Sequence, residues 1–216
     1  MGESWTWIMM IGFVLAAGII LYLFAAIPMM YFQKKEISAF KKLGEMLNFE
    51  INAGRVKLAP NFPVIKGYIG KRFFVVSKAA DGKGRRYNSY SKRSSSRTKW
   101  ILKISTKIHI AQNLSMELMS FNNFKEPISP AEFGKYFKTR ISSQDLNINF
   151  SDELKKDLIQ LYLDTGIYII KLKKQVLYTS NYHGLINDKD VEHCKKKLEV
   201  LAKLADHFEG NMGVRA

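Results

Sequence analysis

The first 32 residues form the most apolar part of the chain. No residue between Trp5 and Phe32 carries a charge. A bilayer core of ~30 Å needs about 20 helical residues, and the run from Ile8 to Ile27 supplies that length by itself. Because backbone groups in lipid must bond within their own segment, such a run predicts a helix. The pattern therefore predicts a transmembrane anchor over residues 1–32.

The residues that flank this segment indicate its orientation. No Lys or Arg precedes it, whereas several lysines follow it directly. Positive residues stay on the cytoplasmic side, and aromatic rings favour the membrane interface. We therefore expect a single-pass protein of the cell membrane, with its N-terminus outside and its C-terminal domain cytoplasmic. The residues expected at the membrane interface are Trp5, Trp7, Tyr31, Lys34, Lys35, Lys41 and Lys42.

Two other interpretations of the apolar segment are less favoured. A buried core helix of this length would normally have a polar face. A cleaved signal peptide would have a positive N-terminal region and an apolar stretch of about 7–15 residues, whereas here the N-terminal region carries Glu3 and no basic residue. The pattern favours a membrane anchor.

Residues 33–48 have the pattern of an amphipathic helix. Ile37, Phe40, Leu43 and Leu47 recur at three- and four-residue spacing, with basic residues on the other side. The helix could lie on an anionic leaflet or pack its apolar stripe against the domain. We expect packing to be its main role.

Beyond residue 48 the hydrophobic period changes to two, which is typical of strands. The clearest strand prediction is Lys99–Ile110, with one apolar and one basic face. Leu114–Phe121 is expected to be its hairpin partner, across a turn at residues 112–113. The other predicted strands are Val64–Ile69, Lys71–Lys78, Ile167–Lys173 and Val176–Ser180.

Helix signals are interspersed among these strands. Ser129-Pro130 marks one helix start, and Ser151 begins a second helix that runs to about Leu163. A last helix is expected from residues 187–188 to 209, with Gly210 as its stop signal. We predict an α+β fold: an N-terminal transmembrane helix, then a mostly antiparallel sheet with helices on one face. The basic cytoplasmic domain would span residues 49–210, and residues 211–216 would form a tail.

The net charge of +15 is concentrated in one part of the sequence. Residues 34–108 contain 19 Lys and Arg against 4 Asp and Glu, which is a net charge of +15 in this stretch alone. A generic soluble surface would not be so uneven, and the asymmetry indicates that one region faces something anionic.

The segment 81–98 is strongly basic and almost free of apolar residues, which predicts a mobile loop. Three interpretations are open: a solvated hairpin tip, contact with anionic lipid headgroups, or binding of nucleic acid or another polyanion with tyrosine rings for stacking. A protein partner is a further alternative. The candidate polyanion contacts are Arg85, Arg86, Tyr87, Tyr90, Lys92, Arg93 and Arg97.

No local motif for catalysis is evident in the sequence. The histidines lack metal-ligand spacing, and no phosphate-binding loop or nucleophile elbow occurs. The single cysteine, Cys194, cannot form an internal disulfide. We therefore expect no catalytic, cofactor-binding or metal-binding residues, and no cofactor.

The segment Glu132-Phe133-Gly134-Lys135-Tyr136-Phe137, the helix from Ser151 and the closing helix Leu198–Phe208 together resemble a family of bacterial membrane-anchored proteins with no assigned activity. The resemblance covers about residues 43–208. The family's pattern has an aspartate where this chain has Gly134. The resemblance implies location and architecture and provides no site residues.

The function expected from these observations is a membrane-anchored, non-enzymatic adaptor or scaffold whose basic domain contacts anionic lipid or a protein partner. A membrane-tethered nucleic-acid or polyanion binder is the alternative, and would bind with a steep salt dependence. An enzyme with a site dispersed along the sequence is a second alternative, since such a site leaves no local motif.

Overall fold

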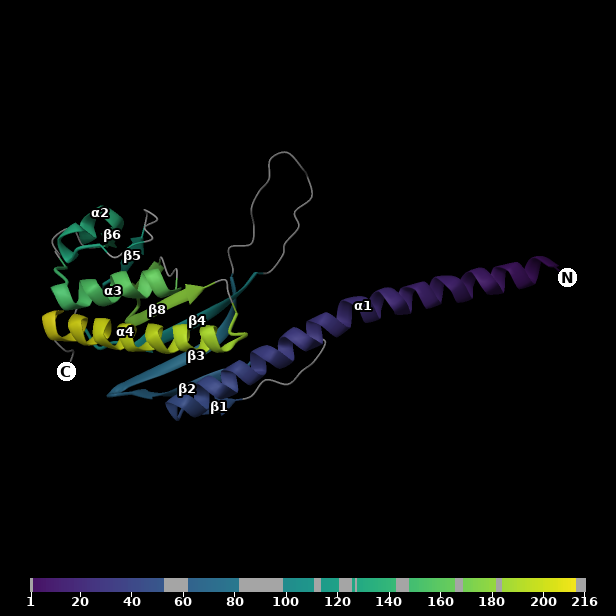
Figure 1. Cartoon of the computed structure of the whole chain (residues 1–216), viewed down its shortest axis with the longest axis horizontal. Helices are drawn as coiled ribbons and strands as arrows, with labels where there is room; N and C mark the ends of the chain where they lie inside the picture. Colours follow the sequence, from purple (N-terminus) through teal and green to yellow (C-terminus); the bar gives the residue numbers. More distant parts are fainter. Residues whose placement is uncertain are drawn as a thin grey trace.

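The fold consists of a long N-terminal helix that leads into an antiparallel sheet with further helices (Figure 1). This computed structural model describes residues 2–52, 62–81, 99–110, 114–120, 126, 128–142, 148–165, 169–181 and 184–212. The predicted α+β class is confirmed.

Helix α1 (Gly2–Leu47) is a single uninterrupted helix. Pro28 lies inside this helix without ending it. The boundary predicted at residue 32, between the anchor and the amphipathic helix, therefore lies within one continuous helix. In the described part of the chain it is the one helix long and apolar enough to cross a membrane, by length and composition. None of its most apolar window is buried inside the molecule, so this segment is not a core helix of the domain.

The last turns of α1 belong to the domain core. Phe40 and Leu43 are fully buried, and Leu47 packs against the same cluster. The packing role expected for the apolar stripe of residues 33–48 is therefore confirmed. Because the same helix carries the exposed apolar segment, the core of the domain begins on the helix that would cross the bilayer.

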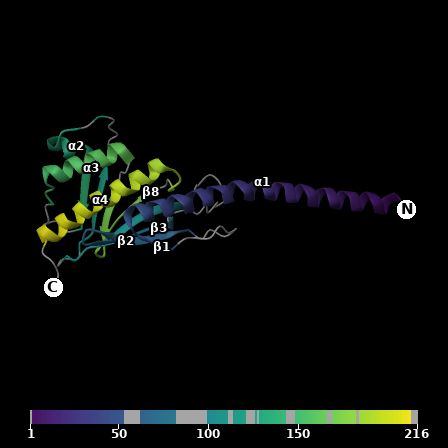
Figure 2. The same cartoon turned by 60° about the horizontal axis from the view of Figure 1, so that its bottom comes forward.

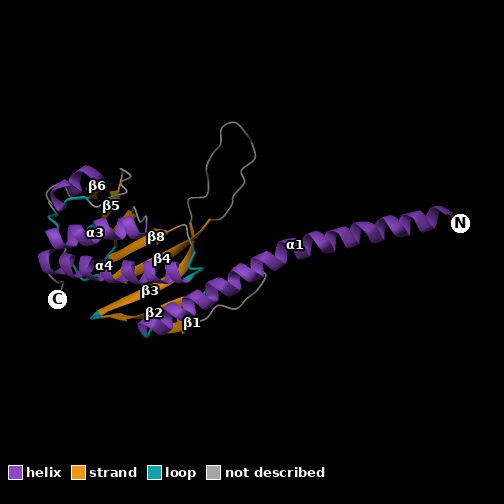
Figure 3. Ribbon diagram, viewed as in Figure 1, coloured by secondary structure: helices purple, strands orange, loops and turns teal. Residues whose placement is uncertain are grey.

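Eight strands form one sheet in the order β1-β2-β3-β4-β8-β7-β5-β6, and every neighbouring pair is antiparallel. The strands are β1 (Glu50–Asn52), β2 (Val64–Ile69), β3 (Arg72–Asp81), β4 (Lys99–Lys107), β5 (Met116–Ser120), β6 (Phe137–Ile141), β7 (Ile169–Lys173) and β8 (Val176–Asn181). Figure 3 shows the sheet behind the helices.

The predicted hairpin between Lys99–Ile110 and Leu114–Phe121 is wrong. Strand β4 ends at Lys107 and pairs with β3 and β8, while β5 pairs with β6 and β7. The β7–β8 hairpin thus lies between the two segments. Hydrophobic alternation fixes which face of a strand is buried, but it does not select the partner strand.

The β7–β8 hairpin turns at Lys174 and Gln175, whose φ angles are 51° and 59°. Two successive left-handed residues are typical of a type I′ turn, which favours Asn and Gly. Here the turn is held from outside: the Gln175 carbonyl accepts from Ile108 N at 2.9 Å, and Gln175 Nε2 donates to the Ile110 carbonyl at 3.3 Å.

The remaining helices follow the sequence signals with two differences. Ser129 caps a short 3₁₀ turn (Pro130–Glu132) that continues into α2 (Phe133–Tyr136), and the chain then forms β6, which the sequence analysis missed. Helix α3 (Asp152–Thr165) is capped by Ser151. Helix α4 (Asp188–Met212) continues past Gly210, so that stop signal is wrong.

The helices cover one face of the sheet. Paired residues in a ladder point to the same side, and the buried strand residues, such as Ile65, Val76 and Ile104, all lie on that side. They form one core with residues of α1, α3 and α4, and Figure 2 shows α1 and α4 on one side of β2 and β3. At Gly67 the Phe49 ring occupies the place of a side chain, so the close packing of β2 here requires glycine.

Candidate functional site

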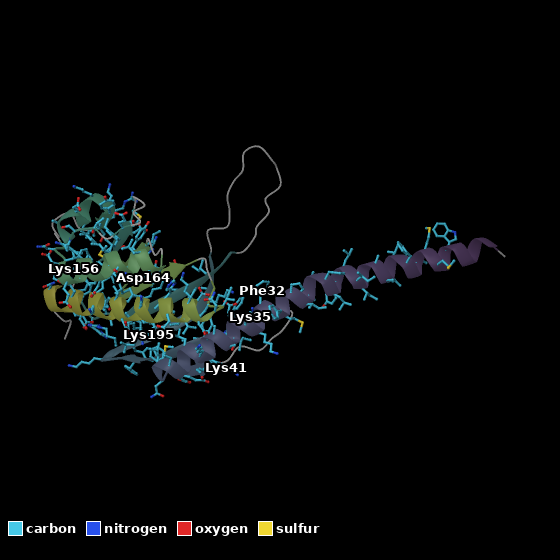
Figure 4. The ribbon with its side chains drawn as sticks, in the orientation of Figure 1. Phe32, Lys35, Lys41, Lys156, Asp164 and Lys195 are labelled. Atoms are coloured by element: carbon cyan, nitrogen blue, oxygen red, sulfur yellow. The ribbon has the colours of Figure 1, made fainter. Side chains whose placement is uncertain are left out.

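The residues predicted at the membrane interface lie along α1, in two environments. Trp7, Tyr31, Lys34, Lys35 and Lys41 are exposed, and the Lys35 ammonium lies 4.7 Å from the centre of the Tyr31 ring. Figure 4 shows Lys35 and Lys41 on the part of the helix that reaches the domain.

Two residues of this predicted set differ from the others. The Lys42 ammonium binds the Asp188 carboxylate at 2.8 Å, so this lysine ties α1 to the start of α4. The side chain of Trp5 lies outside the described part of the structure.

The predicted polyanion contacts between Arg85 and Arg97 lie outside the described residues, as does the whole segment 82–98. The interpretation of that segment stays a prediction. Segment 82–98 connects β3 to β4, and both strands contribute to the surface described next.

The face of the sheet opposite α1, α3 and α4 is basic; we call it the open face. One row of paired residues runs across seven strands on this face, from Lys66 on β2 to Arg140 on β6. Among its described side chains the open face has one carboxylate, Glu117. Its cations are Lys66, Lys103, Lys107, Lys138, Arg140, Lys171 and Lys173.

Most of these cations have no compensating charge. Lys171 binds Glu117 at 2.5 Å, and the Lys103 ammonium lies 4.8 Å from the centre of the Tyr178 ring. The other five are exposed and form no ion pair with the described part of the chain: Lys66, Lys107, Lys138, Arg140 and Lys173. Lys66, Lys138 and Arg140 lie on outer strands of the sheet. Lys107 and Lys173 lie on the central strands β4 and β7, on either side of Val176. The positive charge of this face is therefore available to a ligand.

Small side chains lie together on the β3, β4 and β8 part of the open face. Val75, Ser77, Ser105 and Val176 are half-buried beside one another in the ladder. At one end, Tyr68 and Phe73 are 66% and 43% exposed, and their ring centres are 5.2 Å apart. The open face thus has a patch of small side chains next to exposed aromatic rings, with cations on its outer strands and on its central strands β4 and β7.

A cleft of about 650 Å³ lies where this aromatic end meets the C-terminal part of α4. Tyr68, Phe73 and Lys107 line it on the sheet side. On the α4 side, Arg72 binds Glu209 through two hydrogen bonds of 2.9 and 2.7 Å and Asp206 at 2.7 Å. Glu209 also accepts from the backbone N–H of His109 at 2.6 Å. These charges satisfy one another, which leaves Lys107 and Lys71 as the cleft's cations without an ion pair in the described chain.

The Arg72 network gives the domain a defined response to acid. Hydrogen bonding to Arg72 lowers the pKa of Glu209, and hydrogen bonding to Lys196 lowers that of Asp164. A carboxylate with a lowered folded-state pKa stabilises the fold fully above its unfolded pKa, and this contribution is lost as pH falls through the folded pKa.

We expect the melting temperature to decrease as the pH falls below about 4.5, and we expect Glu209→Gln to make that decrease less steep. Thermal unfolding followed by circular dichroism across pH would test this, with exposed Glu199→Gln as the control; an unchanged acid slope in the Glu209 variant would contradict it.

A buried ion pair joins α1 to the sheet. Glu36 Oε2 accepts from Lys78 Nζ at 2.7 Å, and the two side chains are only 7% and 15% exposed. The Lys78 ammonium also lies 4.2 Å from the centre of the Phe62 ring. This pair was not predicted from the sequence. A signal was present, because Glu36 precedes Phe40 by four residues and so shares the apolar stripe of the helix.

Helix α4 carries titratable groups whose environment disfavours charge. Burial raises the pKa of Cys194 to about 12, so its thiol is protonated and unreactive at neutral pH. Burial also lowers the pKa values of Lys197 and His193. Within the described residues, no group of three His, Cys, Asp or Glu side chains is placed to hold a metal ion.

No protein-family model matches the chain, and no curated protein matches it. Among solved structures, it is similar to the crystal structure of the mycobacterial trehalose monomycolate transport factor A, TtfA. The identity is 7% and the TM-score 0.43, over 80% of this chain and 93% of that chain. Neither family membership nor function follows from a similarity at this level.

Proposed function

We propose that this protein is a single-pass, membrane-anchored adaptor without enzymatic activity, which holds a basic domain against the cytoplasmic face of the cell membrane. The observation that carries this proposal is the continuity of α1. One helix includes both the exposed apolar segment and the buried residues Phe40 and Leu43 of the domain core.

The attachment between anchor and domain is stiff in this proposal. The buried ion pair between Glu36 and Lys78 links α1 to β3. A second, exposed ion pair joins Lys42 to Asp188 at the start of α4 and adds little to this attachment. These contacts begin four residues after Phe32, so the domain lies immediately beside the headgroups rather than at the end of a linker.

The exposed lysines on this stretch of α1 are suited to the inner leaflet. Lys34, Lys35 and Lys41 are exposed close to the end of the apolar segment, and a basic residue near an anionic membrane surface contributes about 1 kcal/mol. We propose that they contact anionic lipid, whereas the open face remains for a partner molecule.

A membrane-tethered nucleic-acid binder is the second candidate. The exposed rings of Tyr68 and Phe73 beside unpaired lysines favour it, because single-stranded nucleic acids bind to aromatic side chains within a positively charged groove. Such binding would weaken steeply as the salt concentration rises.

Cysteine labelling in cells would test the anchor and its orientation. The buried Cys194 is not expected to react, so Ser4→Cys and Lys66→Cys would each provide one reactive thiol. We expect the protein to stay in the membrane fraction after alkaline carbonate treatment. A membrane-impermeant maleimide should label the Ser4 variant in intact cells and the Lys66 variant only after permeabilisation. Release by carbonate, or labelling of the Lys66 variant in intact cells, would refute the proposal.

A further inference from the structure

We infer that the open face of the sheet is a docking surface for an acidic protein surface, held beside the anchor. This inference rests on the proposed membrane anchoring for its geometry, and on the charges of the domain for its specificity.

The direction of the sheet relative to α1 argues against lipid as the occupant. The last turns of α1 pack on the covered face of the sheet, and β2 and β3 run alongside α1 in Figures 1 and 2. The plane of the sheet therefore contains the direction of the anchor. When α1 crosses a bilayer close to the membrane normal, the open face stands edge-on to the membrane rather than flat on the headgroups.

The distribution of charge and side-chain size is suited to a protein surface. Protein interfaces typically have a poorly charged centre with a polar rim. Here Val75, Ser105 and Val176 form an uncharged patch over β3, β4 and β8. Cations surround it: Lys66 on β2, and Lys107 and Lys173 on either side of Val176. A partner with carboxylates around a small, uncharged centre would complement this face. A second copy of the same chain would bring like charges together, and such juxtaposition is strongly unfavourable.

The aromatic residues are poorly arranged for a nucleic acid. The ring of Tyr178, in the middle of the open face, already has the Lys103 ammonium over it. Tyr68 and Phe73 pack against each other at one end, and the uncharged patch beside them consists of small aliphatic and hydroxyl side chains. A nucleic acid would need stacking rings along the track of its backbone, so the arrangement favours an acidic protein.

Charge reversal on the two faces of the domain provides a matched test. Lys107 and Lys173 flank Val176 on the open face, whereas Lys156 and Lys189 are exposed on α3 and α4; Figure 4 shows Lys156 on the helical side. The variants K107E/K173E and K156E/K189E change the net charge equally.

Full-length protein would be placed in neutral phosphatidylcholine nanodiscs, and its binding of poly-L-glutamate would be measured. We expect the open-face variant to bind about tenfold more weakly than the wild type, which corresponds to about 1.4 kcal/mol, and the control variant to bind within about twofold.

The other outcomes would overturn the inference. Equal losses of affinity in both variants would mean that the net charge of the protein alone attracts the probe. If the wild-type protein did not bind poly-L-glutamate, the inferred docking surface would be refuted. If the protein bound polyuridylate more tightly than poly-L-glutamate, and K107E/K173E abolished that binding, the occupant would be a nucleic acid. Loss of binding in nanodiscs that contain phosphatidylglycerol would make it lipid. The same binding measurement in detergent micelles distinguishes failure of this inference from failure of the proposed membrane anchoring. Poly-L-glutamate should still bind in micelles even if carbonate treatment released the protein from cell membranes.

Discussion

Replacing Lys78 with alanine is expected to lower the free energy of unfolding of the domain by about 3–5 kcal/mol. The substitution would leave the Glu36 carboxylate, whose side chain is 7% exposed, as an uncompensated buried charge. Its Oε1 atom already has no hydrogen-bond partner in the described structure, so the carboxylate would lose the ion pair that stabilises it. Denaturant unfolding in detergent micelles, followed by circular dichroism, would measure the change. Lys66→Ala on the neighbouring strand, where the lysine is exposed, is the control and should change stability by less than about 0.5 kcal/mol.

A double substitution separates the burial of a charge from the loss of a contact. Replacing both Glu36 and Lys78 with methionine removes two buried charges and keeps similar volume. Such replacements are often neutral or stabilising, so the double variant should be more stable than Lys78→Ala. A double variant that is less stable than the single one would show that the pair itself, rather than an isolated charge, governs stability here.

The second large effect is expected at Phe40. Its ring is fully buried where α1 meets the sheet, and truncation of a buried Phe to Ala typically costs about 3–5 kcal/mol. Because the cavity would lie between α1 and the rest of the core, Phe40→Ala should loosen the domain from its anchor. Hydrogen exchange of α1 and β2, together with denaturant unfolding, would detect this.

Phe32→Ala is the matched control for Phe40→Ala. Phe32 lies two turns earlier on the same helix and is 56% exposed, so its truncation removes the same atoms without opening a cavity in the domain. Equal losses of stability in the two variants would contradict the role assigned to Phe40.

The features that could be predicted from the sequence are those with local causes. An uncharged apolar run predicts a long helix wherever it occurs, and β2, β7 and β8 lie close to the predicted segments because alternation reports a half-buried strand. The basic side of the open face was also partly evident, since Lys103 and Lys107 alternate with apolar residues in the segment predicted as a strand.

The features that could not be predicted depend on residues far apart in the sequence. The predicted pairing of β5 with β4 was wrong because the β7–β8 hairpin, about 50 residues later in the chain, lies between these two strands in the sheet. The pair between Glu36 and Lys78 forms across 42 positions. The open face requires the register of seven strands, because only that register brings Lys66 of β2 and Arg140 of β6 to the same side.

The central claim is that α1 is one stiff helix from the bilayer into the core of the domain. Pulsed electron paramagnetic resonance in nanodiscs tests it most directly, with spin labels at Gly18→Cys in the apolar segment and Lys66→Cys on β2; the buried Cys194 should remain unlabelled. A continuous helix fixed by Phe40 and Glu36 predicts a single narrow distribution of distances between the two labels. A broad distribution, or one with two peaks, would mean that anchor and domain move independently, and would contradict the claim.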